Sequence, residues 1–369
     1  MQVALTDEER QLRDAVRAFA EARVRTAAAE TDRQARFPRE LVGELGRLGV
    51  LGGVVPERYG GADAGHVAGA LAVEELSAAC ASTGAIVGAH TALVIWPILV
   101  GGRDAQRERY LPRLARGESL GCCVPEEAGV AVRRDGAHYV LDGHARAVVN
   151  GSEAALAVVF ARGAERLAAF LVETTSPGWQ PGSPAETTGL RGTGTAEVVL
   201  AALRLPRENL LGEEEDGPGM AAAARGAGAV ATAVRAVGIA RTALAHALAY
   251  ARERRAFGQA LVEFQGTQWR LADMATAVEA ARLLALRAAS LMDRRLPYTR
   301  EAAMAEVFAA EAAMTVTTQA VQLHGGYGYT REFAVERCFR DATALAAHVA
   351  DEPQRLAIGG ALLREASLP

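Results

Sequence analysis

Two segments in the second half of the chain combine arginine, glycine and aromatic residues in patterns that suit a phosphate-bearing ligand. Tyr250–Gln265 (YARERRAFGQALVEFQ) places Arg254 at the expected end of a long helix, just before a turn at Phe257–Gly258. A guanidinium in that position makes bidentate contacts with a diphosphate. In Gln322–Ala342, the glycines of the Gly325–Gly328 run allow a ligand to approach the backbone closely. We therefore expect an anion site near Arg254.

Other chemistries are disfavoured by residues that the chain lacks or scatters. The chain contains no lysine, so the 40 residues counted as lysine or arginine are all arginines. This excludes Schiff-base catalysis and a GxxxxGK[ST] phosphate loop. The histidines show no HxxxH or HExxH spacing, so no metal is predicted. The four cysteines show no CxxC spacing, which predicts reduced, buried thiols and a cytoplasmic location.

Composition describes a globular chain with a sizeable core. Half of the 369 residues are hydrophobic and 23% are charged. The net charge of −4 creates no long-range attraction to nucleic acid or to an anionic membrane. The charged N-terminal segment MQVALTDEERQLRDAV and the interrupted apolar runs predict neither a signal peptide nor a membrane span.

Hydrophobic periodicity predicts helices in the first and last thirds of the chain. Thr6 and Glu9 form a capping-box pattern at the start of the first helix, and Phe37–Pro38 breaks the helical pattern further on. The acidic run Glu213–Asp216 is interpreted as a solvated linker. The helices are expected at about 6–29, through Leu41 to Leu48, and at 66–81, 84–99, 104–115, 221–250, 264–293 and 299–324.

Short runs of β-branched and aromatic residues mark the middle of the chain as β structure. Such runs, bounded by Gly, Asn, Asp and Pro, are typical of strands. They occur at HYVLDGHARAVVNG, LAVVFARG, LAAFLVETTSPGW, GLRGTGT and AEVVLAALRLP. We predict an α+β, mainly α fold with an N-terminal helical domain (1–118), a middle β-domain of sandwich or barrel type (119–215) and a C-terminal helical bundle (216–369).

Three long motifs occur together in this layout: Gly189–Glu213 (GLRGTGTAEVVL…LPRENLLGE), Tyr250–Gln265 and Gln322–Ala342. With them, the chain resembles the acyl-CoA dehydrogenase family from the PERYGG segment near the N-terminus to Arg340. The resemblance implies a four-helix bundle in the C-terminal domain, an FAD cofactor and α,β-dehydrogenation of an acyl thioester carried by coenzyme A or an acyl carrier protein.

The resemblance also implies which residues hold the cofactor and that the protein is an oligomer. Residues that match Arg254, Phe257, Leu261 and Gln265 contact the FAD of a neighbouring subunit in the family. Those that match Gln322, Gly325 and Gly326 receive it from the other side. A dimer of dimers, or a hetero-oligomer with a homologue, is expected, and the electron-transfer partner stays open.

The segments that face the flavin ring depart from the family pattern. The family's Thr-Glu-Pro-x-Ala-Gly-Ser stretch is Val124–Val130 here, with Gly129 retained and both hydroxyls replaced by valine. The second ring-facing motif, aromatic-Ile-Thr/Ser-Asn-Gly, is Ala147–Gly151, with Val149 in the place of the hydroxyl. Val124, Gly129 and Val149 are therefore expected to line the ring side without the hydroxyls that tune a flavin.

The family's catalytic glutamate is missing. The resemblance places His348 or Val349 at its position, and the family's other location for the base falls near Gly228. A proton next to a thioester carbonyl is weakly acidic, so a base within hydrogen-bond reach is needed. His348 as a base, or Asp351 or Glu352 reaching back, are the candidates. The alternative is that His348 only caps or packs a terminal helix.

Three functions are compatible with these features of the sequence. The first is FAD-dependent oxidation of an acyl thioester with a displaced or substituted base. The second is a flavin-dependent monooxygenase on the same fold, because such enzymes also carry a histidine about six residues beyond Arg-Asp-Ala. The third is a catalytically silent subunit that pairs with an active homologue.

Overall fold

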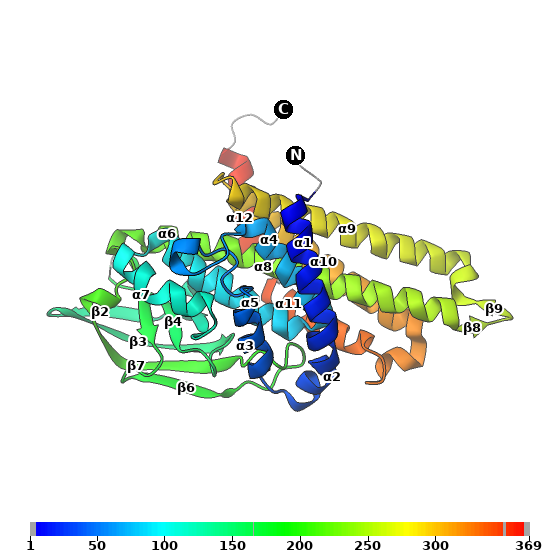
Figure 1. The fold of residues 1–369 in the computed structure, drawn as a ribbon, viewed down its shortest axis with the longest axis horizontal. Coiled ribbons are helices and arrows are strands. Elements are labelled where there is room, and N and C mark those ends of the chain that lie inside the picture. Colours follow the sequence, from blue (N-terminus) through cyan, green and yellow to red (C-terminus); the bar gives the residue numbers. More distant parts are fainter. Residues whose placement is uncertain (1–4, 165, 350–351, 365–369) are drawn as a thin grey trace.

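The computed structural model describes residues 5–164, 166–349 and 352–364. Helices pack against one side of a seven-stranded sheet that comes from the middle of the chain. In Figure 1 the sheet lies at one end of the molecule, and the long C-terminal helices extend to the opposite end. The predicted α+β, mainly helical fold is confirmed, whereas the domain boundaries at 118/119 and 215/216 stay a prediction.

The N-terminal helical region follows the predicted pattern. The Thr6 hydroxyl accepts the Glu9 N–H at 3.1 Å, and the Glu9 carboxylate accepts the Thr6 N–H at 2.7 Å, so the capping box is present. The first helical stretch contains a π-helical turn at Ala20–Val24, continues beyond its predicted end at residue 29 and stops at Ala35, which has a left-handed φ of 50°. The helices are α1 (Asp7–Phe19), η1 (Ala20–Val24), α2 (Arg25–Gln34), α3 (Arg39–Arg47), η2 (Glu57–Tyr59), α4 (Gly65–Ala79), α5 (Ala81–His90), η3 (Thr91–Ile95), α6 (Trp96–Gly101) and α7 (Asp104–Ala115).

The sheet runs in the order β1-β4-β2-β3-β7-β6, with β5 paired to β4. Four predicted strands are present, at β3, β4, β5 and β7, and three short ones were not predicted, namely β1, β2 and β6. Strands β4 and β5 are buried at nearly every position, because helices cover one of their faces and side chains of β3 and β7 pack against the other. The elements are β1 (Gly121–Val124), η4 (Glu126–Ala128), β2 (Ala131–Asp135), β3 (His138–Val148), β4 (Leu156–Arg162), β5 (Leu167–Glu173), β6 (Trp179–Pro184), β7 (Ala196–Pro206) and η5 (Arg207–Asn209).

The predicted strand at 189–195 is wrong, since this segment is an irregular loop. Its backbone groups bind side chains of helices instead of a neighbouring strand. The Leu190 N–H donates to the Asp341 carboxylate at 2.6 Å, and the Gly192 N–H donates to the Ser82 hydroxyl at 3.2 Å. The loop therefore connects the sheet region to the helical regions on both sides of it.

The C-terminal region consists of long helices at the predicted positions. Figure 1 shows α8 extending from the β-sheet end of the molecule to the β8–β9 hairpin at the other end. Glu214, within the acidic run, accepts hydrogen bonds from Tyr139 and Arg134 and so also fastens the linker to the sheet. The elements are η6 (Glu214–Asp216), α8 (Gly217–Glu253), β8 (Arg255–Ala256), β9 (Gln259–Ala260), η7 (Leu261–Glu263), α9 (Gln265–Asp293), α10 (Thr299–His324), η8 (Gly325–Tyr329), α11 (Val335–Val349) and α12 (Glu352–Arg364).

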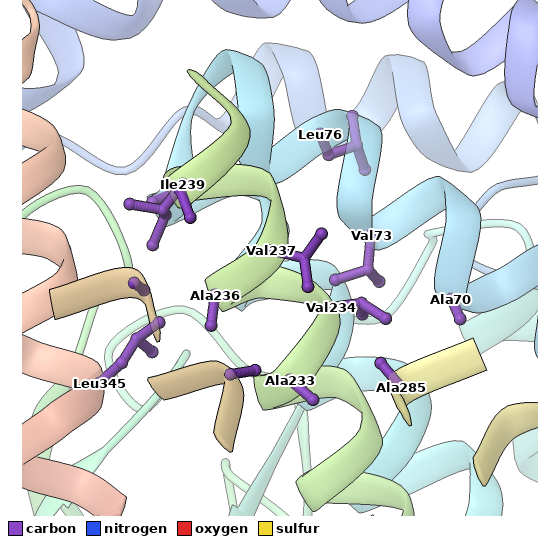
Figure 2. Close-up of a cluster of buried hydrophobic side chains, with 14 of the residues drawn as sticks. Ala70, Val73, Leu76, Ala233, Val234, Ala236, Val237, Ile239, Ala285 and Leu345 are labelled. Atoms are coloured by element: carbon purple, nitrogen blue, oxygen red, sulfur yellow. The ribbon is translucent and has the colours of Figure 1, made fainter. Parts of the chain in front are cut away.

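Small side chains let the helices approach α8 closely. Figure 2 shows Ala233 and Ala236 of α8 among buried residues of other helices, including Val73, Ala285 and Leu345. At the crossing with α4 the fit requires glycine, because a Cβ at Gly238 would lie 2.5 Å from the Glu74 carbonyl oxygen. Deleting or adding even one methylene in such a core is costly. Helix α8 is thus held in a fixed position along its axis and in a fixed rotation about it.

A buried charge network fixes α8 to α1, α4 and α9. Glu74 and Glu75 on α4 are 0% and 3% exposed. Arg241 donates to both carboxylates at 2.6 Å. Arg282 reaches Glu74 at 2.9 Å, and Arg17 reaches Glu75 at 2.7 Å. Buried carboxylates need such partners, because leaving one unpaired is strongly destabilising.

Two helical stretches are long and apolar enough to cross a membrane by length and composition alone, Ala81–Gly101 and Glu214–Glu253. In each stretch, 67% of the most apolar 18-residue segment is buried inside the fold. Core helices of folded proteins share these properties, and both stretches contribute to the helical core described above.

The charge network gives a pH-dependent stability. Burial raises the pKa of Glu75, but the hydrogen bonds from Arg17 and Arg241 outweigh it and lower the pKa from 4.5 to about 2. This carboxylate therefore stabilises the fold above its ordinary pKa, and the contribution is lost as the pH falls towards 2. Between about pH 5 and about pH 3, wild type should lose about 2 kcal/mol more unfolding free energy than Glu75→Gln in urea denaturation. Glu8→Gln, an exposed change on α1, should keep the wild-type slope; an equal slope in Glu75→Gln would contradict the assignment.

Candidate functional site

Arg254 lies at the C-terminal end of α8, as predicted. It is exposed, and its backbone N–H still donates to the Tyr250 carbonyl at 2.9 Å. The chain then reverses in the β8–β9 hairpin through Phe257 and Gly258, both in left-handed conformations. Phe257 is 99% exposed at the tip of this hairpin. This ring is therefore accessible to a ligand or to another chain.

The glycine-rich segment after α10 lies beside Arg254. Gly325 ends the helix with φ 59° and ψ −137°, a conformation that in practice only glycine adopts. Both Gly325 and Gly326 face open space, since a Cβ on either would meet nothing within 4 Å. The Arg254 guanidinium carbon lies 5.9 Å from the centre of the Tyr327 ring. The structure therefore brings the two motifs together.

An aromatic cluster holds the ends of α8 and α10 in this arrangement. The Tyr250 ring stacks on His324 at 4.2 Å, and Phe333 packs edge-on against both. His324 is buried, and burial lowers its pKa. These contacts are hydrophobic and aromatic, so they place Arg254 and the glycines without using their polar groups.

The remaining residues predicted for this half of the site surround the same end of the bundle. Gln265 is the exposed first residue of α9, and Gln322 is exposed in the last turn of α10. Leu261 is partly buried in η7, and its N–H donates to the Arg254 carbonyl at 2.8 Å. All seven predicted residues of the diphosphate side thus lie on two segments, one from the end of α8 to the start of α9 and the other from the last turn of α10 into η8. They form an exposed surface of amides, glycines and one guanidinium.

The residues predicted for the flavin-ring side lie near the sheet. Val124 ends β1 and is 0% exposed, so its side chain is part of the core. Gly129 is exposed, with a φ of 68°. Val149 is partly buried and precedes Asn150, whose side-chain amide donates to the carbonyls of Ile86 and Gly121 at 3.2 and 3.1 Å. Asn150 also adopts a left-handed φ of 65°, a conformation that asparagine tolerates.

The two halves of the predicted site are far apart within one chain. On the ring side, Asn150 binds Ile86 of α5. Helix α5 approaches α8 closely at this point, since a Cβ at Gly88 would lie 3.3 Å from the side chain of Ala231 on α8. Arg254 follows 23 residues later, roughly 35 Å along the helix at about 1.5 Å per residue. A single dinucleotide does not span this distance. The ring-side residues and the Arg254 surface of one chain therefore cannot contact the same FAD.

The residues present fit FAD on one side only. Open glycines, exposed glutamines and Arg254 suit the diphosphate and adenosine part. On the ring side Val124, Val130 and Val149 offer no hydroxyl, and Thr193 in the adjoining loop already donates to the Leu190 carbonyl at 2.9 Å. The site can bind the cofactor's anionic part but supplies fewer polar contacts to the ring than the family pattern does.

The candidate bases lie at the junction of α11 and α12. His348 lies in the last turn of α11, and Glu352 begins α12. The side chains of both residues, and Asp351 altogether, lie outside the described residues. Gly228, at the family's other location for the base, packs against Leu93 of η3.

His90 and the four cysteines are buried in the fold. His90 is fully buried, its Nδ1 accepts the Gly121 N–H at 3.0 Å, and its Nε2 lies 3.2 Å from the Leu114 carbonyl oxygen. Burial lowers its pKa to about 4, so it is neutral. All four cysteines are buried and free, as predicted, and burial raises the pKa of Cys122 and Cys338 to about 12. Within the described residues, no group of three or more potential metal ligands comes together.

One feature was missed from the sequence. A mostly apolar cavity of about 50 Å³ lies between α4, η3, α8 and α9. Its polar lining includes His66 and Trp96, whose rings pack edge-to-face at 4.4 Å. Neither residue belongs to a motif, and their 30-residue separation carries no local signal. Only the tertiary fold brings them together.

Comparison with known proteins identifies the family. The model of the acyl-CoA dehydrogenase N-terminal domain matches residues 6–118, and that of the C-terminal domain matches residues 215–351. A short-chain specific acyl-CoA dehydrogenase from Clostridium acetobutylicum is 40% identical over 380 residues, covering 99% of this chain and 100% of the relative. The chain belongs to the acyl-CoA dehydrogenase family.

Other members of the acyl-CoA dehydrogenase family agree with this assignment. The human short-chain specific mitochondrial enzyme is 39% identical over 377 residues, covering 98% of this chain and 92% of the relative. The structure of butyryl-CoA dehydrogenase from Megasphaera elsdenii superimposes with a TM-score of 0.94 at 34% identity, covering 99% of this chain and 100% of that one. The predicted family is confirmed.

Proposed function

We propose that this chain uses FAD to oxidise an acyl thioester between its α and β carbons, with the acyl group carried by coenzyme A or an acyl carrier protein. The observation that carries the proposal is the end-to-end match to acyl-CoA dehydrogenases, at 40% identity over 99% of the chain. The juxtaposition of Arg254 with the Gly325–Gly326 segment supports it, since this is where a diphosphate would bind.

FAD, when bound, would accept a hydride from the β carbon of the thioester. The chain's own residues would hold and orient the cofactor. Arg254 would pair with the diphosphate, Gly325 and Gly326 would let it approach the backbone, and Phe257 would cover it. Gln265, Gln322 and Leu261 would complete this side, with Val124, Gly129 and Val149 of another copy beneath the ring.

The α-proton must leave to a base on the protein. We place this role at the junction of α11 and α12, with His348, Asp351 or Glu352 as the acceptor. A neutral imidazole accepts a proton near neutral pH, and a carboxylate does so when burial raises its pKa.

Because the two halves of the predicted site cannot meet in one chain, we propose that the protein works as an oligomer. A dimer is the smallest unit that completes an FAD site, and a dimer of dimers is the arrangement expected from the family. A mixed oligomer with a homologue would complete the site in the same way. We place the protein in the cytoplasm, with an electron acceptor of unknown identity.

The proposal is tested by the absorbance spectrum of the purified protein and its response to substrate. We expect a flavin band that bleaches anaerobically when a saturated acyl thioester is added. A yellow protein that no saturated thioester of any chain length bleaches would contradict the oxidation.

Flavin binding itself should depend on Arg254. In Arg254→Met the diphosphate loses its bidentate partner, so the Kd for FAD should rise at least about tenfold, measured by fluorescence titration. Arg252→Met, an exposed change two residues earlier on α8, is the matched control and should bind FAD as wild type does. Equal FAD affinity in both variants would remove Arg254 from the site.

A second candidate function is favoured by the valines at 124, 130 and 149 together with the missing glutamate. These changes strip polar contacts from the ring side while leaving the diphosphate side intact. A silent subunit, which contributes only its Arg254 surface to an active homologue, would show this pattern. Such a subunit would be colourless when pure and would gain flavin only when mixed with its partner chain.

A further inference from the structure

A partly buried arginine of the helical region has no hydrogen-bond or ion-pair partner among the described residues. Arg235 lies in the middle of α8. Its Nε atom is buried and makes no hydrogen bond. The other nitrogen atoms of the Arg235 guanidinium also form no hydrogen bond or ion pair with any described residue. All five N–H groups of a guanidinium are donors. An arginine stays charged at neutral pH, and leaving its buried Nε–H without an acceptor is costly.

The nearest carboxyl groups do not satisfy Arg235. Glu306 and Asp341 attract it electrostatically, but among the described residues no carboxylate oxygen lies within 4.0 Å of it. Glu306 instead accepts a hydrogen bond from Gln354 at 2.6 Å, and Asp341 accepts one from the Leu190 N–H at 2.6 Å. Burial raises the pKa of Glu306 to about 7 and that of Asp341 to about 6, so both carry less negative charge than usual near neutral pH. The positive charge of Arg235 is therefore incompletely balanced.

Arg235 nevertheless stays within reach of a ligand. The residue as a whole is only partly buried, whereas its Nε has no accessible surface. Burial is still sufficient to lower its pKa to about 10. A guanidinium in such surroundings binds an anion more strongly than one on the open surface, because water competes less.

The position of Arg235 links it to the proposed thioester site. Arg235 lies one helical turn beyond Ala231, and Ala231 packs against α5. In the same part of α5, the Ile86 carbonyl accepts a hydrogen bond from Asn150, which follows Val149 on the ring side. Towards the other side is Asp341 on α11, two turns before His348. Arg235 thus lies between the ring-side loop and the helix that leads to the candidate bases.

We propose that Arg235 binds a carboxylate at the far end of the acyl chain, so that the substrate is the thioester of a dicarboxylic acid. This inference rests on the proposed function, since it assumes that an acyl group enters between the ring-side loop and α11. A carboxylate matches the planar, bidentate geometry of the guanidinium. It would also supply the charge that the neighbouring carboxyls leave uncompensated.

The test compares two probes of equal chain length, S-glutaryl-pantetheine and S-pentanoyl-pantetheine, because the pantetheine arm is common to coenzyme A and carrier proteins. Binding to the purified oligomer is measured by isothermal titration calorimetry, which does not require turnover. We expect wild type to bind the glutaryl thioester at least about tenfold more tightly than the pentanoyl thioester. Arg235→Met, which keeps the chain length and removes the charge, should lose this preference.

Controls separate this inference from the proposed function. Arg225→Met, an exposed change on the same helix, should keep the wild-type preference, and Arg235→Gln serves if Arg235→Met does not fold. Failure of wild type to bind either thioester would contradict the proposed function. Equal binding of the two thioesters by wild type, or an unchanged preference in folded Arg235 variants, would overturn the role of Arg235 and leave the proposed function standing.

Discussion

The length of α8 is the constraint on which the rest of the structure depends. With 37 residues it crosses the whole molecule, from the sheet to the hairpin beyond Arg254. Alanines and glycines let α4, α5, α9, α10 and α11 pack closely around it, and the Glu74–Glu75 network fixes its rotation. Because a straight helix cannot bring its two ends together, the proposed ring-side residues near the sheet and the proposed diphosphate-side residues at the far end cannot contact one FAD molecule within a single chain. This geometry supports the proposal that the protein works as an oligomer.

Buried charge is used in two contrasting ways along this helix. At Arg241 the guanidinium is matched by two buried carboxylates, and the result is a structural clamp between helices. At Arg235, less than two turns earlier, the guanidinium has no hydrogen bond within the described residues, and the nearby carboxyls have other partners. The buried Nε of Arg235 is therefore left without an acceptor among the described residues, and this is the observation behind the proposed ligand contact.

The sequence predicted most of the helices, because their apolar positions recur at helical spacing over many turns, and the 104–115 and 299–324 helices begin and end where expected. It failed at 189–195, since strand-like residues there are held by side chains more than 100 residues away, such as Ser82 and Asp341. The pairing of Arg254 with the Gly325 segment was predicted only through the family resemblance. Neither Arg235 nor the His66–Trp96 cavity carries a local signal, because each acquires its surroundings from distant helices.

In the proposed site, the diphosphate-side residues would bind the cofactor, whereas the valines on the ring side would offer few polar contacts to adjust the electron affinity of the flavin. The central claim is that each FAD is shared by at least two chains, with Arg254 of one and the Val149 loop of another. Native mass spectrometry of the purified protein tests this directly, because it reports the number of chains and of FAD molecules in each species. The account predicts FAD only in dimers and larger species, and monomers released by mild activation should be free of flavin. A monomer that retains stoichiometric FAD would contradict it.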